Sequence, residues 1–458
     1  MKKSSISAKE ENMTTTKAFG LWSAVFLGVG SMVGAGIFIV IGEAGAIAGN
    51  LVTVSFLIGA AIALLCGYSL AKLAIRYPSR GGIIEYLVQG YGEGFFSGTV
   101  GILFYLAQLV ALAAVAKSFG TYAATYMAGG VTPFYTNMFA LGVLGVFVLV
   151  NLLGAAFVAR SENIIVSIKV GVLVLFAVAA MVTIDPARLL PSQAPGSIEI
   201  FYALGLTFFA YQGFSVITNS VEDMHNPQKT MLRAMVVAIG LVAVLYVSVT
   251  VAVFGNLPLA EVVKAKDYAL AEAAKPLFGS LGFKIMAATA LLATASAINA
   301  TLYAVTQISY TLAKEGDLPE VYEYNVFHNT EGLLISAALI VPMILFFNLA
   351  QIATVASIAV LLIQGITHVG HLFRYRETGA SLPWIVAAIA GTFGAAGFAV
   401  AYTMHKMPHI VYDLLGLFAA AFAFEVALRL ANARVVRKQI DHTHGVLEKA
   451  LHTLKEKL

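Results

Sequence analysis

The chain has 458 residues, of which 59% are hydrophobic and 11% are charged, and its mean hydropathy is +0.86. Soluble proteins carry roughly 25% charged residues, so this composition excludes an ordinary soluble protein and predicts an integral membrane protein. The net charge is only +4, and the single cysteine, Cys66, excludes an intrachain disulfide and a cysteine-based metal site.

The first 18 residues are polar and lead into an apolar run that is too long for a signal-peptide core and has no small-residue cleavage site. We therefore expect residues 1–18 to remain as a cytosolic tail. Apolar runs of roughly 20 residues then recur, and each can span a hydrocarbon core about 30 Å thick as a helix. About twelve such runs predict an all-α polytopic membrane protein with about 12 transmembrane helices. They are residues 19–45, 50–75, 95–127, 135–158, 161–183, 198–222, 231–255, 280–313, 333–349, 352–373, 382–403 and 409–432.

Lysine and arginine are concentrated in alternate loops, for example at Lys17, Arg76, Lys229 and Arg374. Loops rich in these residues stay in the cytoplasm. We therefore expect a multi-pass protein of the cell membrane with both termini in the cytoplasm. Residues 433–458 carry leucines at helical spacing, which predicts an amphipathic cytosolic tail.

Glycines interrupt the first and the sixth apolar runs. The interruptions are GVGSMVGAGIF, residues 28–38, and LGLTFFAYQGF, residues 204–214. Glycine in a helix interior costs about 1 kcal/mol relative to alanine, and non-helical backbone in hydrocarbon is tolerated only where it is buried or lines a cavity. The glycines therefore indicate either close helix packing or a deliberate break in the helix.

Interrupted spans at corresponding places in two halves of a chain indicate a transporter built from inverted repeats, with its binding site near the bilayer midplane. On this interpretation residues 19–183 form the first repeat and residues 198–376 form the second. Residues 382–432 would supply two extra helices.

A broken first span would expose backbone N–H groups at the start of the helix that follows, and such groups attract a carboxylate. A break in the sixth span would leave carbonyl oxygens free to bind an ammonium group, so a zwitterion fits both. The carboxylate is expected at Gly34, Ala35, Gly36 and Ile37, and the ammonium group at the break from Ala210 to Gly213. The Gln212 amide could reach the substrate side chain or form a hydrogen bond to a neighbouring helix.

Lys169 lies roughly 12 Å along the fifth span from its cytoplasmic start, at 1.5 Å per residue. Ionisable residues at this depth are costly and mark functional sites, and burial favours the neutral form of an amine. We expect Lys169 to load and unload a coupling proton. The alternative is a permanently charged tether between the fifth and first spans.

Four stretches resemble a known family. They are GAGIF in the first span, YPSRGGIIEYLVQGYG after the second, FFAYQGFSVITNSVEDMHNP in the sixth and ASAINATLYAVTQISYTLAKEGDLP in the eighth. The chain resembles the amino acid/polyamine/organocation (APC) superfamily, and within it the proton-dependent amino acid transporters of broad specificity. The resemblance implies a LeuT-type fold of 5+5 inverted repeats and alternating access around a central site.

The resemblance also implies roles for single residues. Phe209 would be the aromatic lid over bound substrate. Lys169 would occupy the place where sodium-coupled relatives bind an ion, so the coupling ion would be H+ and not Na+, with no metal and no cofactor. The residues expected near Lys169 are Val29, Gly30, Thr294 and Ser296.

These features predict a secondary active transporter that imports amino acids by proton symport, and not an enzyme. No carboxylate lies in the sequence beside the two breaks, which favours small neutral substrates over cationic ones. The alternative is an exchanger of amino acids or polyamines without proton coupling. A membrane hydrolase would need catalytic partners that the intramembrane His368 lacks in sequence, and a channel would need a ring of carbonyls or charges. The expected partners are the substrate, a proton and membrane lipid, with no nucleic acid.

Overall fold

The computed structural model describes residues 20–34, 36–79, 81–153, 156–190, 196–326 and 329–431. The two expected cytosolic tails, residues 1–18 and 433–458, lie outside the described residues. Ala35, one of the residues expected to bind the carboxylate, also lies outside them.

Helices account for nearly all of the described chain. The α-helices are α2 (Leu21–Met32), α3 (Gly36–Ala48), α4 (Val52–Arg76), α5 (Ile83–Tyr91), α6 (Phe95–Ala124), α7 (Pro133–Leu153), α8 (Ala156–Ala180), α9 (Glu199–Tyr202), α10 (Leu204–Tyr211), α11 (Pro227–Asn256), α12 (Leu259–Lys264), α13 (Ala269–Ala273), α14 (Lys275–Glu315), α15 (Glu331–Phe346), α16 (Leu349–Phe373), α17 (Tyr375–Thr378), α18 (Leu382–Lys406) and α19 (Pro408–Ala431). The 3-10 helices are η1 (Gly49–Leu51), η2 (Pro186–Leu189), η4 (Gln212–Asp223), η5 (Lys266–Tyr268) and η6 (Glu320–Glu323). Strands β1 (Asn325–Val326) and β2 (Asn329–Thr330) pair antiparallel, with Asn325 opposite Thr330.

The prediction of an all-α polytopic membrane protein is confirmed. Within the described residues, nine helical stretches are long and apolar enough to cross a membrane, and two shorter apolar helices are α2 and α15. One of the nine, Gly36–Arg76, runs through α3, η1 and α4. Each of the twelve apolar runs coincides with one helix or with consecutive shorter helices. The division into two inverted repeats remains a prediction.

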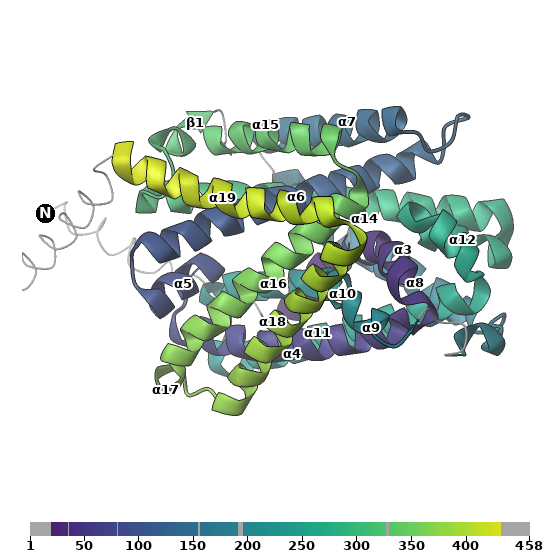
Figure 1. Ribbon diagram of the computed structural model, residues 1–458, viewed down its shortest axis with the longest axis horizontal. Helices are drawn as coiled ribbons and strands as arrows, with labels where there is room; N and C mark the ends of the chain where they lie inside the picture. Colours follow the sequence, from purple (N-terminus) through teal and green to yellow (C-terminus); the bar gives the residue numbers. More distant parts are fainter. Residues whose placement is uncertain are drawn as a thin grey trace, which may run out of the picture.

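The long helices α6, α7, α15 and α19 run along the long axis of the molecule, with α5 and β1 at one end and α12 at the other (Figure 1). α6 lies at the centre of this group, because it contacts α7, α14, α15, α16 and α19. Its buried residues lie on all sides, as expected of a helix that is apolar all round and packed in the core. On the other side of α16, α4 packs against α10, α11 and α18.

The first span is broken where the sequence places its glycines. α2 ends at Met32, and the N–H of Val33 bonds back to the carbonyl of Val29 with a backbone that has left the helical region (φ −80°, ψ 44°). α3 begins at Gly36. The first span is therefore two half-helices.

The sixth span changes its winding instead of opening. α10 ends at Tyr211 and continues directly as η4, a 3-10 helix of 12 residues. Runs of 3-10 helix longer than 3–4 residues are uncommon and often mark a hinge. Ser215, Thr218 and Ser220 each donate a side-chain hydrogen bond to the carbonyl three residues earlier, at 3.3, 2.7 and 2.8 Å. The expected break near residues 210–213 is therefore a tightening of the helix at Gln212.

Candidate substrate and coupling site

The two interrupted spans touch each other through glycines. A Cβ placed on Gly36 would lie 2.7 Å from the carbonyl oxygen of Ala210. A Cβ placed on Gly213 would lie 2.5 Å from the backbone nitrogen of Met32. Only glycine fits at such approaches of main chain to main chain. Both sequence interpretations therefore apply here, because the glycines allow close packing at the point where the helices are interrupted.

Tyr246 of α11 joins the ends of both interrupted helices. Its hydroxyl lies 2.6 Å from the carbonyl oxygen of Met32 and 3.3 Å from that of Ala210, and it can donate to either. Its ring packs against Phe56 and Tyr211, with centroid distances of 5.7 and 5.2 Å. Because the shorter bond goes to Met32, a lone pair of the Ala210 carbonyl oxygen can still accept a hydrogen bond at the contact with α3.

The residues expected to bind substrate gather around this contact. Ile37 and Ala210 are buried, Phe209 is 9% exposed, and Gln212 is half-buried with a side-chain oxygen that has no partner among the described residues. Gly34 faces α14, because a Cβ on it would lie 3.0 Å from the Cβ of Ala297. The first N–H groups of α3 have no acceptor within the helix, as at any helix start. The contact of spans one, six and eight therefore presents both N–H donors and carbonyl acceptors.

Lys169 reaches the end of α2 from α8. Its side chain is fully buried, and its Nζ donates to the carbonyl oxygen of Gly30 at 2.7 Å. α2 ends two residues after Gly30, so this carbonyl belongs to the last turn and needs a partner from outside the helix. A Cβ on Gly30 would lie 2.6 Å from Cγ2 of Val166, so α8 packs closely on α2 at this point. The neighbouring carbonyl of Val29 already accepts from Val33.

Ser296 and Thr294 do not donate to Lys169. The Ser296 hydroxyl lies 2.7 Å from Oε1 of Glu162, to which it donates, and Thr294 donates within its own helix to the carbonyl of Ala290 at 2.7 Å. Glu162 lies seven residues before Lys169 on α8, a spacing that puts both on one helix face. Sequence reasoning missed Glu162, although this spacing from Lys169 was visible.

An ion pair ties the segment between α11 and α14 to α3. Nζ of Lys266, in η5, lies 3.0 Å from both carboxylate oxygens of Glu43, which is 6% exposed. The backbone of Lys266 rests directly on Gly42, where a Cβ would overlap its carbonyl. The segment between α11 and α14 is therefore held against the half-helix whose first turn faces the candidate site.

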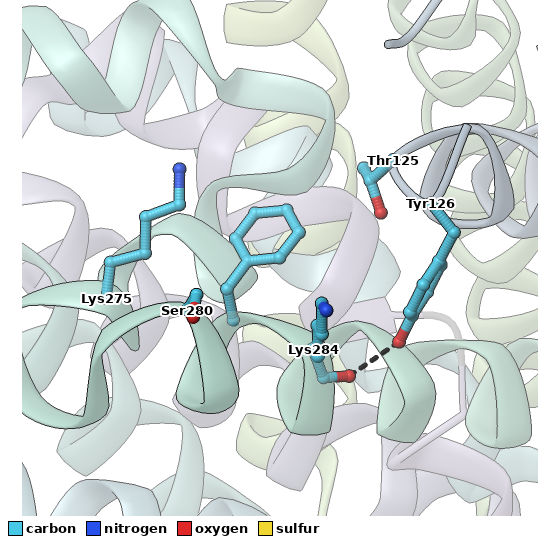
Figure 2. Close-up of a pocket in the computed structure, with 6 residues that line it drawn as sticks. Thr125, Tyr126, Lys275, Ser280 and Lys284 are labelled. Carbon is cyan, nitrogen blue, oxygen red and sulfur yellow. Dashed lines mark hydrogen bonds between the residues drawn. The ribbon is translucent and has the colours of Figure 1, made fainter. Parts of the chain in front are cut away.

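A separate hollow of about 210 Å³ lies where the end of α6 meets the start of α14. Figure 2 shows its side chains, with the hydroxyl of Tyr126 bonded to the backbone oxygen of Lys284 at 2.6 Å. Its other lining residues are Thr125, Lys275, Ser280 and Phe283. Since none of these is a residue expected to bind substrate, this hollow is distinct from the candidate site.

Comparison with known proteins agrees with the geometry. The family model described as amino acid permease matches residues 19–423. The inner membrane transport protein YbaT of Escherichia coli is 37% identical over 378 residues, or 82% of this chain and 88% of that protein. An uncharacterized protein of Methanocaldococcus jannaschii is 33% identical over 420 residues, or 91% of this chain and 97% of that protein. The methylthioribose transporter of Bacillus subtilis is 24% identical over 404 residues, or 82% of this chain and 86% of that protein.

Proposed function

Since this chain belongs to the amino acid permease family, we propose that it imports small neutral amino acids by proton-coupled symport with alternating access. The family match confirms the resemblance of its motifs to the APC superfamily. The chain is a multi-pass membrane protein of a family of amino acid transporters. Substrate range, coupling ion and the cytoplasmic position of both termini are parts of the proposal.

The contact between Lys169 and Gly30 carries the proposal of proton coupling. Among the described residues, the buried Nζ of Lys169 has one hydrogen-bond acceptor, the carbonyl of Gly30. An ammonium has three N–H donors, so a charged Lys169 would leave buried donors unpaired at a cost of several kcal/mol. This packing therefore favours the neutral amine. Protonation would favour a conformation in which α8 and α2 separate and water reaches the ammonium.

Glu162 supports a route for the proton along α8. Seven residues at 1.5 Å each place it about 10 Å from Lys169 along the helix axis. It is half-buried and accepts a hydrogen bond from Ser296 of α14. A carboxylate in this position stabilises a nearby ammonium and can receive its proton through water.

The charge around the site favours neutral zwitterions as substrates. Residues 20–42 and 200–221 contain no aspartate or glutamate, so a second cationic group on the substrate would have no carboxylate partner there. The free N–H groups of α3 suit a carboxylate, and the carbonyl of Ala210 suits an ammonium. The 3-10 winding of η4 provides a point where α10 and the following segment can change their relative direction.

Uptake by the purified protein in liposomes tests the proposal. We expect radiolabelled alanine to accumulate when an inward proton gradient is imposed, and unlabelled small neutral amino acids to compete better than putrescine or methylthioribose. Lys169→Gln should abolish the effect of the gradient. Lys284→Gln, which removes an exposed lysine of α14, is the control and should behave as the wild type.

Two results would contradict the proposal. Equal alanine accumulation with and without the gradient, in the wild type and in Lys169→Gln, would remove proton coupling and favour the exchanger. Competition by putrescine or methylthioribose but not by neutral amino acids would remove the proposed substrate class.

A further inference from the structure

Two buried histidines near the C-terminal end of α16 share one serine of α4. Oγ of Ser69 lies 2.8 Å from Nδ1 of His368 and 2.7 Å from Nδ1 of His371. None of the three side chains is more than 1% exposed. Nε2 of His371 lies 2.8 Å from Oγ1 of Thr378, which donates its proton to the carbonyl of Tyr375 at 3.0 Å.

These contacts fix the direction of every proton in the network. Because the Thr378 hydroxyl donates to a carbonyl, it must accept from Nε2–H of His371. A neutral His371 then has a bare Nδ1, which accepts from the hydroxyl of Ser69. The Ser69 oxygen in turn accepts from Nδ1–H of His368. The neutral form of His368 therefore has an unprotonated Nε2.

That nitrogen has no hydrogen-bond partner among the described residues. The same is true of the oxygen and the nitrogen of the Gln364 side chain. Gln364 is fully buried and lies one helical turn before His368, on the same face of α16. Buried polar atoms in proteins are nearly always hydrogen-bonded. Here the Nε2 lone pair of His368 accepts no hydrogen bond from the described residues, and the whole Gln364 carboxamide one turn away is also unpaired.

We propose that His368 is a proton-binding site, at which Nε2 takes the proton and the Gln364 side chain, unpaired among the described residues, turns so that its carboxamide oxygen accepts the new N–H. The proton adds to the ring lone pair, no other bond forms or breaks, and His368 becomes a cation. Nδ1–H of His368 still donates to Ser69, so the rest of the network is unchanged. Protonation of His371 would instead require the Ser69 hydroxyl to turn toward His368 and the proton of His368 to move from Nδ1 to Nε2. Only His368 offers a ring nitrogen that accepts no hydrogen bond in the neutral network, and the geometry therefore selects His368.

Each histidine has a basic neighbour, so the choice of His368 rests on its unused lone pair and not on the surrounding charges. Lys72, one turn after Ser69 on α4, acts electrostatically on His371, and His371 acts on His368. The other titratable or charged groups on elements packed against α16 near this end are Cys66, Tyr68 and Arg76 on α4, Glu85, Tyr86 and Tyr91 on α5, Tyr105 on α6, Tyr211 on α10, Glu425 and Arg429 on α19, and Arg374, Tyr375, Arg376 and Glu377 beyond its C-terminus. α18 has no titratable residue between positions 382 and 401. Glu425 is already paired with Arg429, and Glu377 with Arg374.

The site would make the contact between α4 and α16 sensitive to protonation. A cation in a fully buried position raises the free energy of the packed state unless water or a counter-charge reaches it. Binding of a proton at His368 would therefore favour separation of α4 from α16. The proton-binding step is independent of Lys169 and of the transported substrate, so it can be tested without transport.

Nitrogen NMR of the full chain, labelled with ¹⁵N-histidine and held in lipid nanodiscs, tests the inference directly. Signals are assigned with His368→Gln and His371→Gln, and His405→Gln serves as the control because His405 is exposed. At neutral pH we expect His368 to be protonated at Nδ1 only and His371 at Nε2 only. On acidification Nε2 of His368 should gain a proton before His371 changes.

A second variant tests the donor–acceptor direction of the hydrogen bonds in this network. Thr378→Val removes the acceptor of Nε2–H on His371, so the protons can reverse and His368 should shift toward the form protonated at Nε2. The inference is overturned if neutral His368 in the wild type carries its proton on Nε2, if His371 becomes protonated first, or if His368 stays neutral until the protein unfolds. None of these results bears on whether the chain transports amino acids.

Discussion

Replacing Gly213 by alanine should disrupt the contact between the two interrupted spans. The new Cβ would lie 2.5 Å from the nitrogen of Met32 and 2.5 Å from the carbonyl carbon of Ser31, whereas ordinary contacts begin at 3.4 Å. The difference of 0.9 Å (3.4 minus 2.5) must come from movement of α2 against η4, because both atoms belong to the backbone. Overpacking of this kind costs about 1–3 kcal/mol.

The effect on transport should exceed the effect on stability. A displacement of about 1 Å at a binding site can reduce turnover about 100-fold. The same movement would strain the bond from Tyr246 to Met32. We expect Gly213→Ala to reduce alanine uptake in liposomes by about 10- to 100-fold and to raise KM, while the thermal unfolding midpoint in detergent falls by a few degrees.

Gly240→Ala is the matched control. Gly240 lies inside α11, and a Cβ added there meets nothing within 4 Å. Alanine is favoured over glycine in a helix by about 1 kcal/mol, so this variant should be at least as stable as the wild type and transport normally. If Gly213→Ala instead transports with the wild-type rate and KM, the contact of the two interrupted spans does not form the binding site.

Three further changes test neighbouring parts of the site. Tyr246→Phe keeps the ring but removes the hydroxyl that joins the two helix ends, so the free energy of unfolding in detergent should fall by about 1–3 kcal/mol. Glu162→Gln keeps an acceptor for Ser296 but removes the charge, and should slow gradient-driven uptake while exchange of labelled for unlabelled substrate continues. Lys266→Met leaves Glu43 buried without its counter-ion, and should increase the rate of amide hydrogen exchange in residues 257–268. An unchanged value in any of the three assays would show that the contact removed by that substitution does not have the role given to it here.

The membrane fold could be predicted from sequence because apolar runs of the required length are a strong and local signal. The break in the first span was also predictable, because Gly34 lies two residues after the end of α2 and Gly36 is the first residue of α3. The winding of the sixth span was not predictable. Its serine and threonine residues form side-chain bonds to backbone carbonyls that stabilise η4, and such bonds are equally compatible with a turn or a helix end.

The missed residues depend on contacts between segments far apart in the chain. Tyr246 is one of 19 tyrosines and lies in an apolar run, so its sequence position gives no sign that its hydroxyl reaches α2. Ser69 and His371 are separated by 302 positions, so their hydrogen bond could not be inferred from spacing. Lys169 could be singled out from sequence because a lysine within an apolar span is energetically costly and therefore rare.

Proton entry evoked by substrate is the most direct test of the central claim that amino acid import is coupled to a proton at Lys169. Liposomes containing the protein and a pH-sensitive dye are given an external neutral amino acid with no imposed gradient. We predict acidification of the interior by the wild type and by Lys284→Gln, and none by Lys169→Gln. Amino acid uptake by the wild type without acidification would contradict the account.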